Sequence, residues 1–76
     1  MRVLIVEDSP TFLDLLCTNM VERGLEVDPI ANLAMATEIL QVKEFDAILL
    51  DMHLSDSQGL ATYFSVRALV GDRPII

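Results

Sequence analysis

Short apolar runs alternate along the chain with segments whose apolar residues recur at helical spacing. Residues 3–6 form an unbroken run of branched aliphatic side chains, which is typical of a strand covered on both faces. Residues 45–50 are expected to form another strand, with an unbroken apolar run at residues 47–50. Residues 25–30 instead alternate apolar and polar positions up to Pro29. A proline cannot donate a ladder hydrogen bond, so this segment is expected to be a strand at the edge of a sheet.

The segments between and after these strands have the signals of helices. Ser9 can accept a hydrogen bond from an unpaired amide, and Pro10 lacks the amide that would go unpaired, so the pair predicts a helix start. Gly24 predicts the end of that helix. A second helix is expected to begin after Asn32, and a third to span residues 59–69.

The last residues continue the alternation of elements. Residues 71–73 are expected to form a turn and residues 74–76 the start of a fourth strand. The resulting order βαβαβαβ is typical of a parallel sheet with helices on both faces. Apolar first and third strands beside an edge-marked second strand favour the flavodoxin-like strand order 2-1-3-4. We therefore predict an α/β fold, a flavodoxin-like doubly wound parallel sheet that is incomplete.

Composition narrows the classes of function. The chain has 76 residues, enough for one domain with a modest core. Twelve acidic and five basic residues give a net charge of −7, which argues against nucleic acid as a partner. The apolar runs are too short to cross a bilayer, and no secretion signal is recognisable. A single cysteine, Cys17, fits a reducing compartment, so we expect a cytoplasmic chain without membrane contact.

Acidic residues follow two of the expected strands. Glu7 and Asp8 come directly after the first strand, and Asp51 ends the third. Ligands of doubly wound sheets bind beyond the carboxyl ends of the strands, so these side chains are expected to meet there. Clustered carboxylates repel one another unless a cation intervenes, and oxygen ligands favour a hard ion, most naturally Mg²⁺. The pattern predicts that Glu7 and Asp8 hold the metal while Asp51 attacks a phosphoryl group.

The segments VLIVEDSPTF (3–12) and FDAILLDMHLSDSQGL (45–60) closely resemble the receiver domain (CheY-like) of two-component response regulators. The resemblance implies that Asp51 accepts a phosphoryl group from a sensor histidine kinase or a phosphotransfer protein. It also implies that Asp8 binds Mg²⁺ directly, that Glu7 acts through metal-bound water, and that the backbone carbonyl of His53 completes the protein ligands. Such a module is a phosphoryl acceptor and not an enzyme with turnover.

Two departures from the family pattern matter. Receivers usually carry a proline four residues after the phosphoacceptor, where this chain has Ser55, so the loop is expected to be less rigid. Family members also continue through a hydroxyl residue at the end of strand 4 and a lysine at the end of strand 5. Neither residue is present, so residues 1–76 are expected to be the N-terminal part of a receiver domain, ending within strand 4.

Two other functions are weighed against the receiver. A receiver-like module for interaction or oligomerisation would not be phosphorylated, and the missing hydroxyl and lysine keep this alternative open. An aspartate-nucleophile phosphohydrolase places a second aspartate two residues after the nucleophile, where this chain has His53. That difference argues against the enzyme.

Three further expectations concern single features. Asp56 is expected to cap a helix or to be a solvated loop residue and not a metal ligand. Cys17 is expected to be a small core residue. An unpaired edge at strand 4 and an incompletely covered sheet face predict that the chain self-associates.

Overall fold

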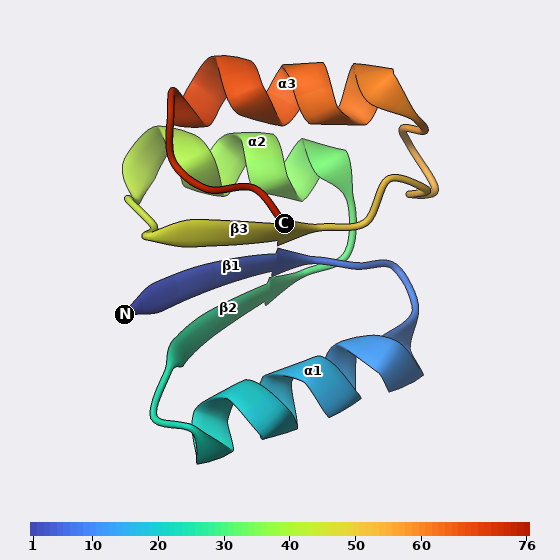
Figure 1. The fold of residues 1–76 in the computed structure, drawn as a ribbon. Coiled ribbons are helices and arrows are strands. Elements are labelled where there is room, and N and C mark those ends of the chain that lie inside the picture. Colours follow the sequence, from blue (N-terminus) through green and yellow to red (C-terminus); the bar gives the residue numbers. More distant parts are fainter.

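Three parallel strands form a sheet in the order β2-β1-β3 in the computed structural model, which describes residues 1–76 (Figure 1). The elements follow the chain as β1 (Arg2–Val6), α1 (Pro10–Glu22), β2 (Glu26–Ile30), α2 (Leu33–Val42), β3 (Ala47–Leu50) and α3 (Leu60–Val70). The predicted α/β class and the order 2-1-3 are confirmed. None of the three helices combines the length and apolar character that crossing a bilayer requires.

Strand β2 lies at the edge of the sheet, as Pro29 predicted. It pairs with β1 alone, from Arg2 opposite Glu26 to Val6 opposite Ile30. Pro29 lies opposite Ile5 in this register. Because β2 has a partner on one side only, the amide that proline lacks is not needed for a second ladder.

The start of a fourth strand predicted at residues 74–76 lies beside β3, although the last element long enough to count as a helix or strand is α3. These residues make only an isolated parallel bridge, between Ile48 and Ile75. The amide of Ile48 donates to the carbonyl of Pro74 at 2.9 Å, and the amide of Ile76 donates back to Ile48 at 2.7 Å. The segment therefore lies beside β3, where order 2-1-3-4 places it, but its pairing is too short to make a strand.

The predicted helix starts are confirmed by their caps. The Ser9 hydroxyl accepts a hydrogen bond from the amide of Phe12 at 3.4 Å, with Pro10 as the first helical residue. The Asn32 side chain accepts from the amide of Met35 at 2.9 Å and caps α2. Helix α3 follows Gly59 without a side-chain cap.

Helix α2 has a second cap, which comes from a distant part of the chain. The carboxylate of Asp56 accepts hydrogen bonds from the amides of Leu33 and Ala34, each at 2.9 Å. A negative charge at this position also interacts favourably with the positive end of the helix dipole. The sequence-based expectation that Asp56 caps a helix is therefore confirmed. The helix that it caps is α2, which precedes it by more than twenty residues.

The main hydrophobic core lies between the sheet and the pair α2 and α3, which cover one face together (Figure 1). All ten side chains of this cluster are at most 8% exposed: Leu4, Val6, Ile30, Ala36, Phe45, Ile48, Leu50, Leu54, Val66 and Val70. Burial of this kind contributes about 1.5–3 kcal/mol for each large aliphatic side chain. The alternating side chains of β1 and β3 thus anchor two helices on this face.

The opposite face of the sheet is covered by α1 alone (Figure 1). Val3 and Ile5 of β1 are buried on this side, yet no residue of α1 is buried. Phe12 remains 50% exposed and Leu15 56% exposed. This face therefore retains apolar surface that the chain itself does not cover.

The core predicts how the chain responds to substitution at Ile48, which has no exposed surface. Ile48→Val should lower the free energy of unfolding by about 0.5–1.5 kcal/mol, and Ile48→Ala by about 2–5 kcal/mol, because each leaves a larger cavity. Urea denaturation followed by circular dichroism measures both. Val42→Ala is the matched control, since Val42 is 80% exposed. Its effect should stay within about 0.5 kcal/mol.

The second cap of α2 predicts a pH dependence of stability. The hydrogen bonds from Leu33 and then Ala34 hold the pKa of Asp56 below its usual value. The contribution of Asp56 is therefore present above the unfolded pKa of about 3.9 and is lost as pH falls through the lower folded pKa. Between those two values the wild-type chain should lose stability more steeply than Asp56→Asn, which has no such carboxylate. Equal slopes in acid denaturation would contradict the assignment.

Candidate metal centre

The last hydrogen bonds of the two ladders place three acidic residues side by side. The amide of Glu7 donates to the carbonyl of Ile30 at 3.0 Å, which continues the β1–β2 pairing by one residue. The amide of Asp51 donates to the carbonyl of Val6 at 2.9 Å, which continues the β1–β3 pairing in the same way. Asp8 follows Glu7 at the start of the loop to α1. The carboxyl ends of β1 and β3 therefore present all three acids at the same end of the sheet.

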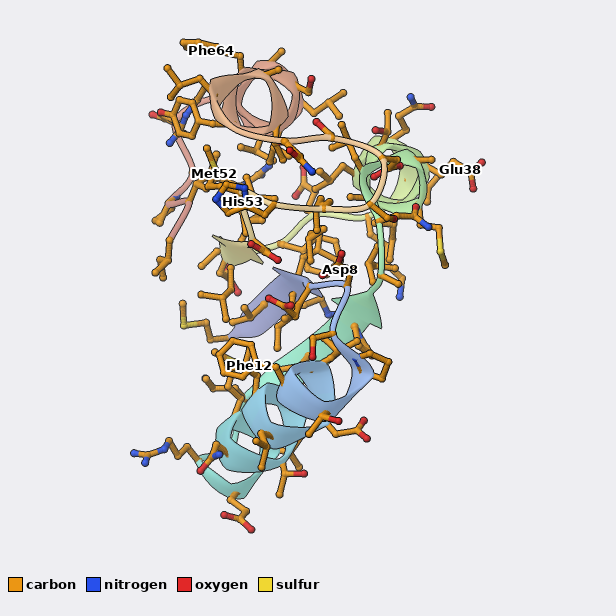
Figure 2. The ribbon with its side chains drawn as sticks, turned by 90° about the vertical axis from the view of Figure 1, so that its right-hand side faces the viewer. Asp8, Phe12, Glu38, Met52, His53 and Phe64 are labelled. Carbon is orange, nitrogen blue, oxygen red and sulfur yellow. The ribbon has the colours of Figure 1, made fainter.

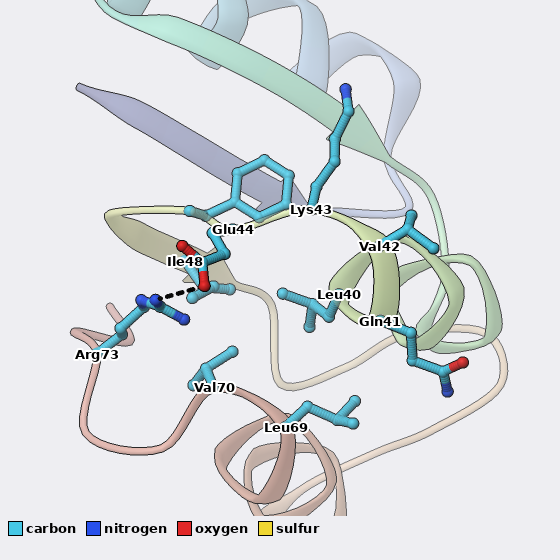
Figure 3. Close-up of a pocket in the computed structure, with 10 residues that line it drawn as sticks. Leu40, Gln41, Val42, Lys43, Glu44, Ile48, Leu69, Val70 and Arg73 are labelled. Carbon is cyan, nitrogen blue, oxygen red and sulfur yellow. Dashed lines mark ion pairs between the residues drawn. The ribbon is translucent and has the colours of Figure 1, made fainter.

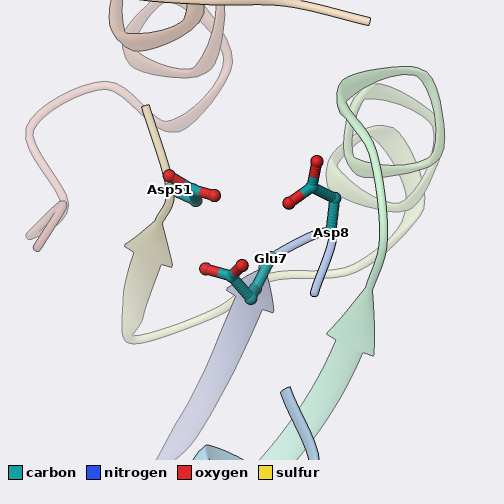
Figure 4. A group of neighbouring side chains, drawn as sticks. All are labelled: Glu7, Asp8 and Asp51. Carbon is teal, nitrogen blue, oxygen red and sulfur yellow. The ribbon is translucent and has the colours of Figure 1, made fainter. Parts of the chain in front are cut away.

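The carboxylates of Glu7, Asp8 and Asp51 form one cluster (Figure 4). Each offers an oxygen that lies within 4.8 Å of the oxygens offered by the other two. Asp8 is exposed, whereas Glu7 and Asp51 are half-buried. The cluster expected from the sequence is thus present, and it is open to solvent on the side of Asp8.

No basic side chain neutralises this cluster. The chain has three ion pairs, Arg2–Glu26, Lys43–Asp28 and Arg73–Glu44, and none includes the clustered acids. Like charges at this separation repel one another and favour a bound cation. The donor set consists of oxygens alone, which fits a hard divalent ion such as Mg²⁺.

Main-chain amides occupy part of the hydrogen-bonding capacity of the cluster. Oδ1 of Asp51 accepts from the amide of His53 at 3.0 Å, and Oε1 of Glu7 accepts from the amide of Ser9 at 3.1 Å. These bonds fix the orientation of two carboxylates without adding positive charge. They leave the second oxygen of Asp51 without a main-chain partner.

A hollow of about 250 Å³ adjoins the cluster on the side of α1. Glu7 and Asp51 form part of its wall, and the other side chains in it are apolar: Ile5, Val6, Phe12, Leu16, Leu49 and Leu50. Apolar surface beside a charged group lowers the local dielectric and strengthens its electrostatic interactions. The cluster therefore has water on one side and a hydrocarbon wall on the other.

The loop after β3 carries His53 (Figure 2), and the amide of this residue lies 3.0 Å from Oδ1 of Asp51 in the cluster. This residue is exposed and contributes its amide to Asp51. His53 is the one histidine of the chain, and no cysteine belongs to the acidic cluster. The pattern does not fit a zinc site, which takes nitrogen and sulfur ligands.

Cys17 is not the core residue that the sequence predicted, because it is half-buried on α1, a helix without buried residues. Its partial burial raises the pKa of the thiol, and the charge of Asp14 raises it further. A raised pKa lowers the thiolate fraction and hence the reactivity. Cys17 is therefore not a candidate nucleophile.

A second hollow, of about 350 Å³, lies at the other end of the sheet between the carboxyl ends of α2 and α3 (Figure 3). Leu40, Phe45 and Val70 form part of its wall, and Arg73 pairs with Glu44 across its rim at 3.5 Å. Its charged groups are thus partly paired with each other. The one group of side chains that could hold a metal ion, Glu7, Asp8 and Asp51, lies outside this hollow.

Comparison with known proteins agrees with this geometry. The family model of the response regulator receiver domain matches residues 3–76. No individual curated protein matches the chain. Among solved structures, the chain is similar to a two-component response regulator from Clostridium difficile. The TM-score is 0.92 and the identity 24%, over 99% of this chain and 61% of that one.

Two other similar structures contain ligands of the kind that the cluster suggests. Response regulator TrrA from Thermotoga maritima was solved in complex with Mg(2+)-BeF, with a TM-score of 0.88 and 28% identity over 97% of this chain and 64% of that one. A response regulator from Burkholderia pseudomallei carries a phosphorylated aspartic acid, a calcium ion and citrate. Its TM-score is 0.87 and its identity 26%, over 97% of this chain and 44% of that one.

The chain spans less than two thirds of each of these three proteins. The family model, by contrast, covers the chain almost from end to end. The strand order and the acidic cluster at the ends of β1 and β3 agree with the same assignment. The chain belongs to the response regulator receiver domain family.

Proposed function

We propose that this chain is the phosphoacceptor module of a two-component response regulator and that Asp51 accepts the phosphoryl group. The observation that carries the proposal is the cluster of Glu7, Asp8 and Asp51, whose oxygens lie within 4.8 Å of one another with no basic partner. A carboxylate without a positive neighbour is a good nucleophile only if the charge of the incoming phosphoryl group is neutralised. A divalent ion held by the adjacent acids meets that requirement.

Asp8 is proposed as a direct ligand of Mg²⁺, together with Asp51 and the backbone carbonyl of His53. Glu7 is proposed to act through metal-bound water. The Ser9 amide donates to Oε1 of Glu7 at 3.1 Å and orients this carboxylate within the cluster. When bound, Mg²⁺ supplies positive charge to the phosphoryl oxygens and reduces the repulsion among the carboxylates.

The transfer itself is assigned to the free oxygen of Asp51. The His53 amide holds Oδ1, so Oδ2 is the oxygen that can attack phosphorus. Its bond to phosphorus forms as the bond between phosphorus and a histidine nitrogen of the donor breaks, and the product is an acyl phosphate. Asp51 is consumed in this step, so the chain is a substrate of phosphoryl transfer and not an enzyme with turnover.

A sensor histidine kinase or a phosphotransfer protein is the proposed donor. TrrA, which is 28% identical to this chain, was solved in complex with histidine kinase ThkA. A cytoplasmic location belongs to the same proposal and is supported by the single cysteine. The acidic net charge of −7 supports a protein partner over nucleic acid.

Labelling with a small phosphodonor such as acetyl phosphate tests the acceptor role. The wild-type chain should gain one phosphoryl group in Mg²⁺, and Asp51→Asn should gain none, as measured by intact-mass spectrometry. Asp8→Asn should need at least about tenfold more Mg²⁺, because loss of a ligand weakens the metal site. Asp14→Asn is the matched control, since Asp14 is an exposed acid of α1 outside the cluster.

Two results would count against the acceptor role. One is a folded wild-type chain that takes up no phosphoryl group in Mg²⁺, which would favour the alternative of a receiver-like interaction module. The other is labelling that persists in Asp51→Asn, which would assign the acceptor to another residue.

Self-association of the 76-residue chain is a separate proposal. Residues 74–76 hydrogen bond to β3 on one side only, and Ile76 is 72% exposed. The α1 face adds further exposed apolar surface at Phe12 and Leu15. Unpaired strand edges and apolar patches both favour association with another copy.

Light scattering on a dilution series tests the association. The wild-type chain should give a mass above the 8.4 kDa of one chain. Ile76→Lys should lower that mass, because a charge opposes edge pairing. Gln41→Lys adds the same charge on exposed surface of α2 and should leave the mass unchanged. A mass of one chain at every concentration, together with a cooperative thermal transition, would rule the association out.

A further inference from the structure

The loop that follows the proposed phosphoacceptor is tied to a helix that precedes it in the chain. Asp56 lies five residues after Asp51, and its carboxylate binds the amides of Leu33 and Ala34 at the start of α2. Oδ1 and Oδ2 each take one amide at 2.9 Å. Charged acceptors make stronger hydrogen bonds than neutral ones, and both oxygens are used here. The loop is therefore joined to α2 by a two-point contact.

Helix α2 is capped by two residues from separate segments, Asn32 and Asp56. The effect of Asp56 on the 51–59 loop can therefore be distinguished from the effect of helix capping itself. Asn32 immediately precedes the helix and takes the amide of Met35 at 2.9 Å. Asp56 takes the amides of Leu33 and Ala34. Each residue satisfies amides that have no partner within the helix. Only Asp56 connects those amides to the loop beside the acidic cluster.

The same loop holds the main chain of His53 against Asp51. The amide of His53 donates to Asp51 Oδ1 at 3.0 Å, and the next residue, Leu54, is 1% exposed within the core. On the far side of Asp56, the hydroxyls of Ser57 and Thr62 lie 2.6 Å apart. The loop thus has an anchor in the core, one on α3 and one on α2.

The contact with α2 matters more for the rigidity of this loop than it would in a receiver with a proline at position 55, because this chain has a serine there. Proline fixes φ near −65° and lowers the conformational entropy of a loop, whereas serine leaves that freedom in place. Ser55 is exposed and makes no side-chain hydrogen bond within the chain. The loop is closed by its own main chain, since the amide of Leu54 donates to the carbonyl of Ser57 at 2.8 Å and that of Gly59 to Met52 at 2.7 Å. The side-chain restraint on this part of the loop comes from its neighbours Leu54 and Asp56.

We propose that Asp56 is a positioning residue: by binding the first amides of α2, it holds the 51–59 loop so that the main chain of His53 stays against Asp51. The metal-binding part of this inference rests on the proposed function, because the His53 carbonyl is one of the proposed ligands. Its consequence is that the acidic cluster and the start of α2 respond to each other. A change at one shifts the other through the 51–59 loop.

Hydrogen exchange in the metal-free chain tests the positioning role directly. Asp56→Ala should speed exchange of the His53 amide by roughly two- to tenfold relative to the Ile48 amide of the core. Asn32→Ala is the matched control, because it also removes a cap of α2 but leaves the 51–59 loop attached. It should leave the ratio of His53 to Ile48 exchange unchanged. The Ile48 rate is compared between variants as well, because a core amide reports any change in global stability.

Asp56→Asn is a second variant for the same exchange measurement and replaces Asp56→Ala if that variant does not fold. An asparagine retains one acceptor oxygen, so the exchange ratio should lie between those of the wild type and a chain without the contact. A ratio that changes equally in Asn32→Ala and in the Asp56 variants would overturn the proposal, since α2 capping alone would explain it. So would a ratio that does not change in any of them.

Titration with Mg²⁺ then separates this inference from the proposed function. In the wild type, the NMR shifts of Asp51 and of the Leu33 and Ala34 amides should move together, and they should do so in Asn32→Ala as well. In Asp56→Ala, the α2 shifts should stop responding and Mg²⁺ affinity should fall severalfold, and Asp56→Asn should lie between this variant and the wild type. Mg²⁺ that leaves Asp51 undisturbed in the wild type would refute the metal site, while the exchange ratio still decides the role of Asp56. Unchanged affinity and an intact α2 response in the Asp56 variants would refute the coupling alone.

Discussion

Parallel pairing of β1 with β3 is the constraint on which the acidic cluster depends. The register sets Val6 opposite Leu50, so the residues that follow each strand leave the sheet at the same level. The hydrogen bond from the Asp51 amide to the Val6 carbonyl continues that register for one residue. A shift by one position would turn Asp51 to the other face and open the cluster. The buried side chains of both strands hold the register, and hence the site.

The acidic cluster lowers the stability of the folded chain and at the same time favours the binding of a cation. Three carboxylates that share one edge raise the energy of the folded chain unless a cation is present, and no lysine or arginine lies among them. Amides from Ser9 and His53 orient two of the acids without cancelling their charge. A ligand that binds only the folded chain stabilises it, so the same repulsion that strains the free chain favours an incoming divalent ion.

The two faces of the sheet contribute unequally to the hydrophobic core. Helices α2 and α3 bury a continuous cluster of ten side chains against one face, whereas α1 buries none of its own residues on the other. The 51–59 loop belongs to the well-packed side through Leu54, and Asp56 extends that attachment to α2. The elements that position the candidate site are therefore supported by the main core. The α1 side keeps exposed apolar side chains, among them Phe12 and Leu15.

The sequence by itself determined the type and order of six elements, because apolar periodicity and capping residues act locally. Ser9 and Asn32 start helices by accepting hydrogen bonds from amides three residues away, and Pro10 follows Ser9 without an amide that would go unpaired. Pro29 marks an edge through its missing amide. The acidic cluster could also be predicted from the sequence, since parallel strands align their carboxyl ends. Residues 74–76 were expected only to start a fourth strand, and they form a single bridge because a strand needs a sustained ladder.

Only the tertiary structure decided which distant groups meet. An aspartate in a loop is expected to cap the helix that follows it, but Asp56 caps α2, which no local pattern indicates. The half-exposure of Cys17, Phe12 and Leu15 likewise depends on how much of the sheet α1 covers, and periodicity cannot give that. Local signals fix where an element begins and ends. Contacts between elements depend on how they pack, and packing exists only once the chain has folded.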